Sequence, residues 1–191
     1  MRKEDIITLP DRRLRQRSAK VHVVTTDTLQ LIDNMTSVAL DWEDSRPHEI
    51  SAALSAVQIG LLERVVILRS DFDDKETREF TALINPEIVK YEGEITKDYE
   101  GCLSVSGIYG KVPRYGKIRV KALDVDGHEV RFKAEGFLAH VIQHEVDHTN
   151  GIVFIDHIRD EKDAFYKLDE KGELQPLDYG QFIEKNSILW D

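Results

Sequence analysis

The residues best suited to chemistry lie in the segment His144-Glu145-Val146-Asp147-His148 and at Cys102, the only cysteine of the chain. Residues four apart on a helix lie one turn above each other on the same face, so His144 and His148 can direct two imidazoles at one metal ion. Glu145 lies beside them as a candidate acid or base. A catalytic zinc-like site needs three protein ligands and an open position for water, so the identity of the third ligand decides the interpretation.

Three positions bear on that third ligand. In metzincin metalloproteases a glycine and then a histidine follow the second histidine; Gly151 fits this pattern, but Phe154, at the deciding position, cannot bind a metal. His157 lies beyond the helix stop that Asn150-Gly151 signals. Cys102 has the right chemistry, although a lone cysteine is also a common small buried side chain. Residue types alone therefore leave open a pair of core histidines that binds no metal.

The hydrophobic pattern predicts the elements that must position these residues. Apolar residues at helical spacing indicate a helix over 27–42, capped by Thr26 or Asp27. A second, more apolar helix starts after Gly136 and carries both histidines. Alternating runs indicate strands. We expect strands at 65–68, 81–84, 87–89, 117–122 and 130–132, a tight turn at 126–127, polar loops at 43–49 and 70–78, and a hairpin turn at 170–173, whereas 180–190 fits helix or extended chain equally well.

Length and composition restrict the class of protein. The 191 residues suit one domain spanning 1–191. A formal net charge of −10 argues against direct nucleic-acid binding. No apolar run is long enough for a membrane span, and no apolar segment behind the N-terminus indicates a secretory signal. A single cysteine cannot form an internal disulfide. We therefore expect a cytoplasmic protein with no membrane partner.

Three separated segments resemble the peptide deformylase family. Glu100-Gly101-Cys102-Leu103-Ser104 and Gln143-His144-Glu145-Val146-Asp147-His148 match two motifs of that family without change. The segment 51–60 is similar to its first motif, Gly-x-Gly-Leu-Ala-Ala-Pro-Gln-x-Gly, with departures at Ser51, Ala53, Ser55 and Val57. The resemblance extends over about residues 6–157 and leaves out the tail at 167–191. The implied fold is α+β, with antiparallel sheets around a central metal-binding helix and the N-terminal helix packed outside.

The resemblance also implies a reaction. It implies three ligands of one divalent metal ion, namely Cys102, His144 and His148, with Fe(II) the usual metal and Zn, Ni or Co able to take its place. Glu145 would take a proton from water and return it to the leaving amine. The Gln58 side-chain amide and the Leu103 backbone N–H would stabilise the oxyanion. The implied activity removes the N-formyl group from formyl-methionine at the N-terminus of newly made polypeptides and releases formate.

Substrate binding follows from the same resemblance. The peptide would add as a β-strand to an exposed sheet edge, with main-chain hydrogen bonds at Ala53 and Gly101. Val141 would line the pocket for the methionine side chain, although simple core packing explains this valine equally well. The ribosome is an expected partner, but the tail is not a basic docking helix, so the sequence leaves its docking surface open.

The departures in the first motif remove neither a proposed ligand nor Glu145 or Gln58. A Cβ at Ala53 would crowd the substrate strand if a glycine were needed there for a positive φ or a close approach, and would be tolerated in extended backbone. We therefore expect retained hydrolysis with an altered affinity or peptide preference. Arg114 and Asp147 are a candidate buried pair that orients the metal helix.

Three alternatives remain from the sequence. The first is a divergent deformylase-like hydrolase that acts on another N-acyl peptide. The second is a zinc endopeptidase, which should need a third ligand downstream of His148. The third is a metal-binding or interaction protein without catalysis, in which Glu145→Gln would leave every function intact.

Overall fold

The computed structural model describes residues 1–46 and 49–190. Its helices and strands follow one another along the chain in this order: α1 (Thr26–Asp44), β1 (Ala53–Ser55), β2 (Val65–Arg69), β3 (Phe80–Cys102), β4 (Val105–Leu123), β5 (Glu129–Glu135), α2 (Gly136–Thr149), β6 (Phe165–Leu168), β7 (Leu174–Pro176), α3 (Tyr179–Phe182) and α4 (Ser187–Trp190). The strands pair antiparallel in the order β1-β2-β3-β4-β6-β7, and β5 also pairs with β4. No helix within the described residues is long and apolar enough to cross a membrane.

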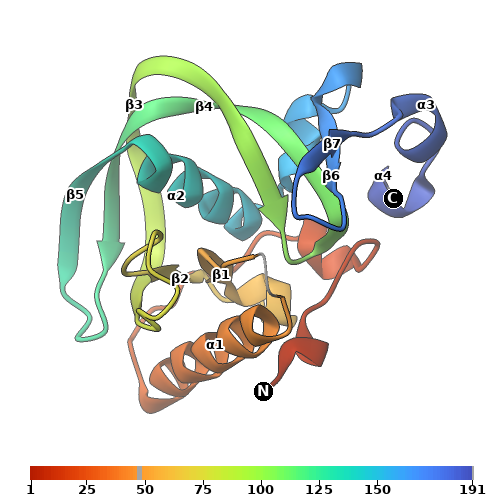
Figure 1. The fold of residues 1–191 in the computed structure, drawn as a ribbon. Coiled ribbons are helices and arrows are strands. Elements are labelled where there is room, and N and C mark those ends of the chain that lie inside the picture. The colour runs from red at the N-terminus through yellow and green to blue at the C-terminus, as the bar shows by residue number, and fades with distance from the viewer. Residues whose placement is uncertain (47–48, 191) are drawn as a thin grey trace.

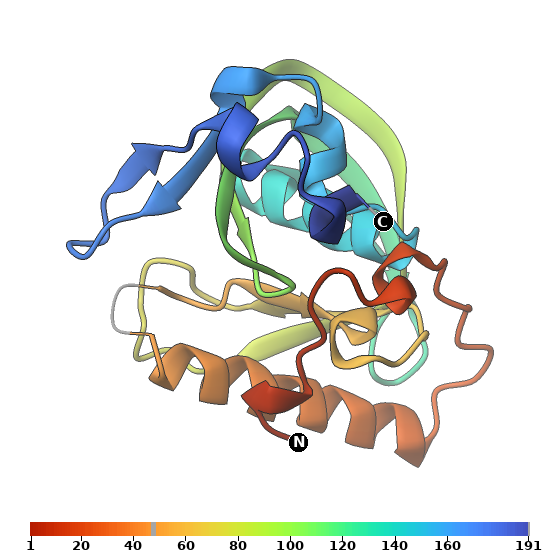
Figure 2. The same cartoon turned by 90° about the vertical axis from the view of Figure 1, so that its right-hand side faces the viewer.

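Helix α2 lies at the centre of the molecule. The long β3 and β4 strands curve over it on one side, and β1, β2 and α1 lie on the other (Figure 1). Figure 2 shows the same arrangement from the side, with α1 along the outside of the β1–β2 layer. Ten of the 14 residues of α2 are buried, including His144 and His148. The predicted α+β fold, with antiparallel strands around a central helix and an outer N-terminal helix, is confirmed.

Three clusters of buried apolar residues stabilise this arrangement of helices and strands. One lies between α1 and the β1–β2 layer and contains Met35 and Leu54. A second packs α2 against the β-sheet through Ile142 and Ile118. The third lies at the C-terminal end of α2 around Phe154, where it receives the tail. The metal-ligand candidates therefore lie among three packed layers rather than on a loop.

Some predicted boundaries were wrong. The cap of α1 is Thr25, not Thr26 or Asp27, and the helix continues to Asp44 into the predicted loop 43–49. The last turn persists because Glu43 is buried in an ion pair with Arg69, 2.7 Å away. Residues 47 and 48 of that loop lie outside the described residues.

The predicted strands at 81–84 and 87–89 form one strand, β3, with register shifts that absorb the Asn85-Pro86 step. A bulge lets a strand continue past residues that break its regular pairing. The turn at 126–127 is confirmed as the β4–β5 hairpin, and the turn at 170–173 as the β6–β7 hairpin. The ambiguous segment 180–190 contains most of α3 and all of α4, each only four residues long.

Candidate metal centre and active site

Cys102, His144 and His148 come together where the end of β3 meets α2. The Cys102 Sγ atom and one ring nitrogen of each histidine all lie within 4.8 Å of one another, and Sγ is 3.2 Å from His148 Nε2. Bond lengths of about 2.3 Å to sulfur and 2.1 Å to nitrogen place the ligand atoms of a tetrahedral site about 3.6 Å apart. One thiolate and two imidazoles at this spacing fit a divalent transition metal.

Glu100, two residues before Cys102, fixes the orientation of His144. Its carboxylate lies 2.8 Å from His144 Nδ1, so Nδ1 carries the proton and Nε2 is left free for the metal-ligand cluster. Arg114 donates to both oxygens of Glu100, at 2.7 and 3.0 Å. Burial alone would raise the pKa of Glu100, but the hydrogen bonds from His144 and Arg114 lower it to about 2. Glu100 is therefore ionised at neutral pH, beside the ring of His144.

Arg114 also donates to Asp147, at 2.5 Å, which confirms the predicted buried pair. Asp147 in turn lies 2.7 Å from Nε2 of His157. His157 therefore contacts the side of α2 through Asp147 and is not part of the ligand cluster. The result is a continuous chain of polar contacts, from His144 through Glu100, Arg114 and Asp147 to His157, that ties α2 to β3 and β4.

Glu145 is buried beside the ligands, with 4% of its surface exposed. Burial raises the pKa of this carboxyl, and the neighbouring His144 opposes that rise. The Ser55 hydroxyl lies 2.6 Å from Glu145 Oε2 and 3.1 Å from the Glu145 main-chain oxygen, so two acceptors of one residue share its single proton. Ser55 is one of the departures from the family motif, and it holds the candidate base.

Replacing Ser55 with alanine is expected to lower the free energy of unfolding by about 1–3 kcal/mol, because it leaves a buried carboxylate without a donor. Urea denaturation of the wild type and the variant measures this difference. Ser37→Ala is the matched control, since the Ser37 hydroxyl bonds Asp33 on the exposed face of α1; there we expect a change within about 0.5 kcal/mol. Equal effects at the two positions would contradict the assignment of a structural hydrogen bond to Ser55.

Gln58 and Leu103 both lie next to Cys102. The Ser55 N–H donates to Gln58 Oε1 at 2.8 Å, which leaves the Gln58 amide nitrogen 3.5 Å from Cys102 Sγ. Leu103 is the first residue of the two-residue turn between β3 and β4, directly after Cys102. Both residues line the same cavity as His144 and Glu145. Their predicted role as oxyanion donors stays a prediction that this geometry allows.

A cavity of about 400 Å³ opens onto the ligand cluster. The three predicted substrate-binding residues, Ala53, Gly101 and Val141, all line it. Ala53 lies on β1, the last strand at this end of the sheet among the described residues, so a peptide strand can be added there. A Cβ on Gly101 would lie 2.6 Å from the Tyr109 ring, so only glycine fits at that position. These contacts are consistent with the predicted roles and do not test them.

The departures in the first motif cause no backbone strain. Asn85 is the single non-glycine residue with a positive φ in the described chain, so Ser51 and Ala53 adopt conformations open to any residue. The Ser51 N–H donates to the buried Glu43 carboxylate at 2.9 Å. The Glu43–Arg69 ion pair therefore anchors the start of the segment that leads into β1.

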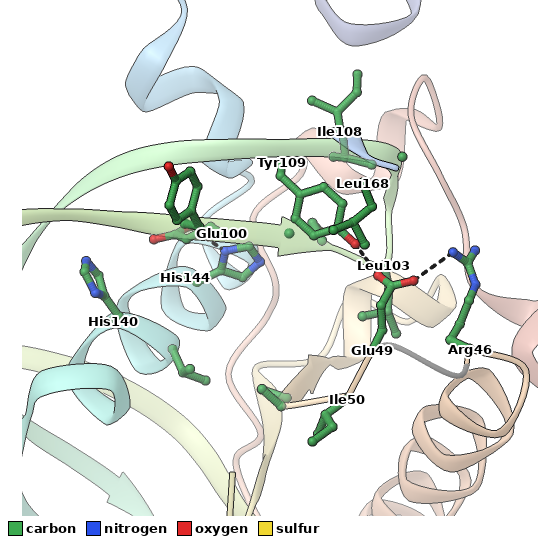
Figure 3. Close-up of a pocket in the computed structure, with 18 of the residues that line it drawn as sticks. Arg46, Glu49, Ile50, Glu100, Leu103, Ile108, Tyr109, His140, His144 and Leu168 are labelled. Carbon is green, nitrogen blue, oxygen red and sulfur yellow. Dashed lines mark hydrogen bonds and ion pairs between the residues drawn. The ribbon is translucent and has the colours of Figure 1, made fainter. Parts of the chain in front are cut away.

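Sequence reasoning missed two parts of the cavity. Tyr109 donates a hydrogen bond to Glu49, which also pairs with Arg46 at 3.0 Å, and Figure 3 shows this group beside Leu103. The β6–β7 hairpin also reaches the cavity, through Leu168 and other residues. No motif marks either feature, because each consists of ordinary residues that only the folded chain brings together.

Comparison with known proteins gives a consistent result. The model of the polypeptide deformylase family matches residues 3–164. A peptide deformylase of Thermomicrobium roseum is 42% identical over 171 residues, covering 88% of this chain and 93% of that protein. One of Brachyspira hyodysenteriae is 41% identical over 175 residues, covering 91% and 88%.

Solved structures agree with the sequence matches. A peptide deformylase of Synechococcus elongatus in complex with actinonin superimposes with a TM-score of 0.71 at 31% identity, covering 80% of this chain and 76% of that one. A Met-Ala-Ser-bound class I type b enzyme of Acinetobacter baumannii gives a TM-score of 0.70 at 30% identity, covering 80% and 96%. The matched region contains every candidate ligand and the candidate base, and the chain belongs to the peptide deformylase family.

Proposed function

We propose that this protein is a metal-dependent hydrolase that removes the N-formyl group from formyl-methionyl peptides and releases formate. The observation that carries the proposal is the cluster of Cys102, His144 and His148 beside a cavity that Cys102, His144 and the buried Glu145 line. The Met-Ala-Ser peptide bound to the Acinetobacter baumannii relative supports a peptide as the ligand of this cavity.

We propose Fe(II) as the resident metal, with Zn, Ni and Co able to bind the same ligands. The mixed sulfur and nitrogen donors suit all four ions. When bound, a divalent cation supplies Lewis acidity and makes water a stronger acid near neutral pH. The Glu100 carboxylate behind His144 increases the basicity of that ligand and holds its ring in place.

Each residue of the site then has a separate role in hydrolysis. Glu145, whose pKa is raised by burial, accepts the proton of the attacking water and passes it to the leaving amine. The Gln58 amide, held by the Ser55 N–H, and the Leu103 N–H donate to the oxygen that gains charge as the formyl carbon becomes tetrahedral. The free edge of β1 and Gly101 on β3 bind the peptide main chain on its two sides. Val141 contacts the methionine side chain.

The direct test is turnover of formyl-Met-Ala-Ser by the anaerobically purified, Fe(II)-loaded protein, with formate release as the measurement. Cys102→Ala should lose both the metal and the activity. Acetyl-Met-Ala-Ser tests the divergent N-acyl hydrolase, and a peptide with a blocked N-terminus tests internal cleavage by an endopeptidase. Turnover of either of these with none of the formyl peptide would overturn the proposal.

We also propose that the chain works as one domain in the cytoplasm, where new polypeptides emerge from the ribosome. The free thiol of Cys102 supports this setting, because a reducing compartment keeps a thiol ligand available. Co-sedimentation of the protein with ribosomes at increasing salt tests the partner.

A further inference from the structure

The β6–β7 hairpin lies beyond the segment that the family model matches, which ends at residue 164. Nevertheless Leu168, Gly172 and Leu174 of this hairpin line the same cavity as His144 and Glu145. A volume of about 400 Å³ falls within the roughly 300–1,000 Å³ of pockets that enclose a whole small ligand. The cavity therefore has room for more than the formyl-methionyl group.

The hairpin presents an apolar face to this cavity. Leu168 and Leu174 are direct partners in the register of β6 and β7, and partners across two strands project from the same face. Ile108 of β4 lines the cavity as well. Figure 3 shows Ile108 and Leu168 beside Tyr109, on the opposite side of His144 from His140. Three aliphatic side chains thus cover the end of the cavity farther from the start of α2.

The hairpin is held in place before any ligand binds. Its first strand pairs with β4 through Tyr109 and Tyr166, and Phe165 at its base is 1% exposed in the core. Its turn is fixed by the Asp169 carboxylate, which accepts from the backbone N–H groups of Lys171 and Glu173, each at 2.9 Å. A surface that is already ordered binds a ligand without losing further conformational entropy.

On the facing side of the cavity, the two charged residues Glu49 and Arg46 pair with each other. Glu49 accepts a hydrogen bond from Tyr109 and pairs with Arg46, as Figure 3 shows. This contact joins β4 to the segment that precedes β1. A charged peptide side chain that enters here would lose water without gaining a partner, whereas an aliphatic side chain would gain contact with the hairpin.

The length of an extended peptide determines which of its residues lie close to the β6–β7 hairpin. With the formyl group at the metal-ligand cluster, the methionine side chain reaches Val141, within one turn of His144 on α2. The peptide continues at about 3.3 Å per residue in extended form. Ala53 of β1, Gly101 and the hairpin line one cavity, so a peptide held between β1 and Gly101 would place its second and third residues within reach of the hairpin.

We propose that the β6–β7 hairpin is a specificity-determining surface of this enzyme, which binds the second and third residues of the formyl peptide and prefers aliphatic side chains there. The inference rests on the proposed deformylase function. It adds a side-chain preference that comes from a hairpin outside the segment that the family model matches.

The test compares three substrates of the Fe(II)-loaded enzyme: formyl-Met amide, formyl-Met-Leu-Leu and formyl-Met-Ser-Ser. The variants are Leu168→Ser and Leu174→Ser, both at partly exposed positions, and the matched control is Val125→Ser, 43% exposed in the β4–β5 turn. Each hairpin variant should raise KM for formyl-Met-Leu-Leu by about 3- to 10-fold, the loss expected for part of one aliphatic contact. Its kcat, its KM for formyl-Met amide and all constants of the control should stay unchanged.

Two results would overturn the inference while leaving the proposed function intact. One is an unchanged KM for formyl-Met-Leu-Leu in both hairpin variants. The other is an equal change for formyl-Met amide, which would indicate a general disturbance of the site. A wild-type enzyme that turns over none of the three peptides would instead overturn the proposed function and this inference with it.

Discussion

Glu145→Gln is expected to lower kcat by about 10²- to 10⁴-fold, the range that general acid–base catalysis contributes. Glutamine has nearly the same shape and can still accept the hydrogen bond from Ser55, which lies 2.6 Å from the carboxylate. It cannot take the proton of the attacking water. Steady-state kinetics with formyl-Met-Ala-Ser measures the loss, and metal analysis of the same sample should find one equivalent, because Glu145 is not among the three candidate ligands.

Glu184→Gln serves as the control for this variant, since Glu184 is an exposed carboxylate in the tail. It should keep wild-type kcat. A Glu145→Gln enzyme that retained its metal and more than a tenth of the wild-type kcat would exclude Glu145 as the base.

Arg114→Met is expected to lower the free energy of unfolding by about 3–5 kcal/mol, the usual result of removing one partner from a buried ion pair. Arg114 is 4% exposed and pairs with the buried Glu100 and the partly buried Asp147, and both carboxylates would lose this cation. Since Glu100 also holds His144 at 2.8 Å, the variant should bind its metal more weakly. Chemical denaturation measures the first effect and metal competition with a chelator the second.

Arg119→Met is the matched control, because Arg119 pairs with Glu92 at the same 2.7 Å but has a side chain that is 46% exposed. Exposed pairs contribute about 0–1 kcal/mol. The triple variant Arg114→Met, Glu100→Gln, Asp147→Asn should recover part of the loss, since it leaves no buried charge unpaired. Similar losses at positions 114 and 119 would contradict the role given to burial.

Local patterns were sufficient where a residue's neighbours in the chain also determine its surroundings. The spacing of His144 and His148 and the apolar residues around them predicted α2 and the meeting of the two rings, because helical geometry alone brings them to one face. The Asp126-Gly127 turn and the turn at 170–173 followed from residues that permit tight turns. These features depend on separations of a few residues.

No local sequence pattern predicted the contacts between segments that are distant in the chain. The extension of α1 to Asp44 depends on Arg69, which is 26 residues away from Glu43. The single strand β3 forms because β4 pairs along its length past Pro86. In both places a tertiary partner outweighs the local preference that predicted a loop or a strand end.

The sequence by itself determined the chemistry of this protein: a thiol, two imidazoles and a carboxylate within two motifs of one enzyme family. The tertiary structure alone decided what surrounds them. It placed Ser55 against Glu145, completed the chain of contacts from His144 to His157, and brought the β6–β7 hairpin to the cavity. The reason is physical, since ligand types are properties of residues, whereas the partner of a buried polar group and the surface of a pocket depend on segments that meet only when the chain folds.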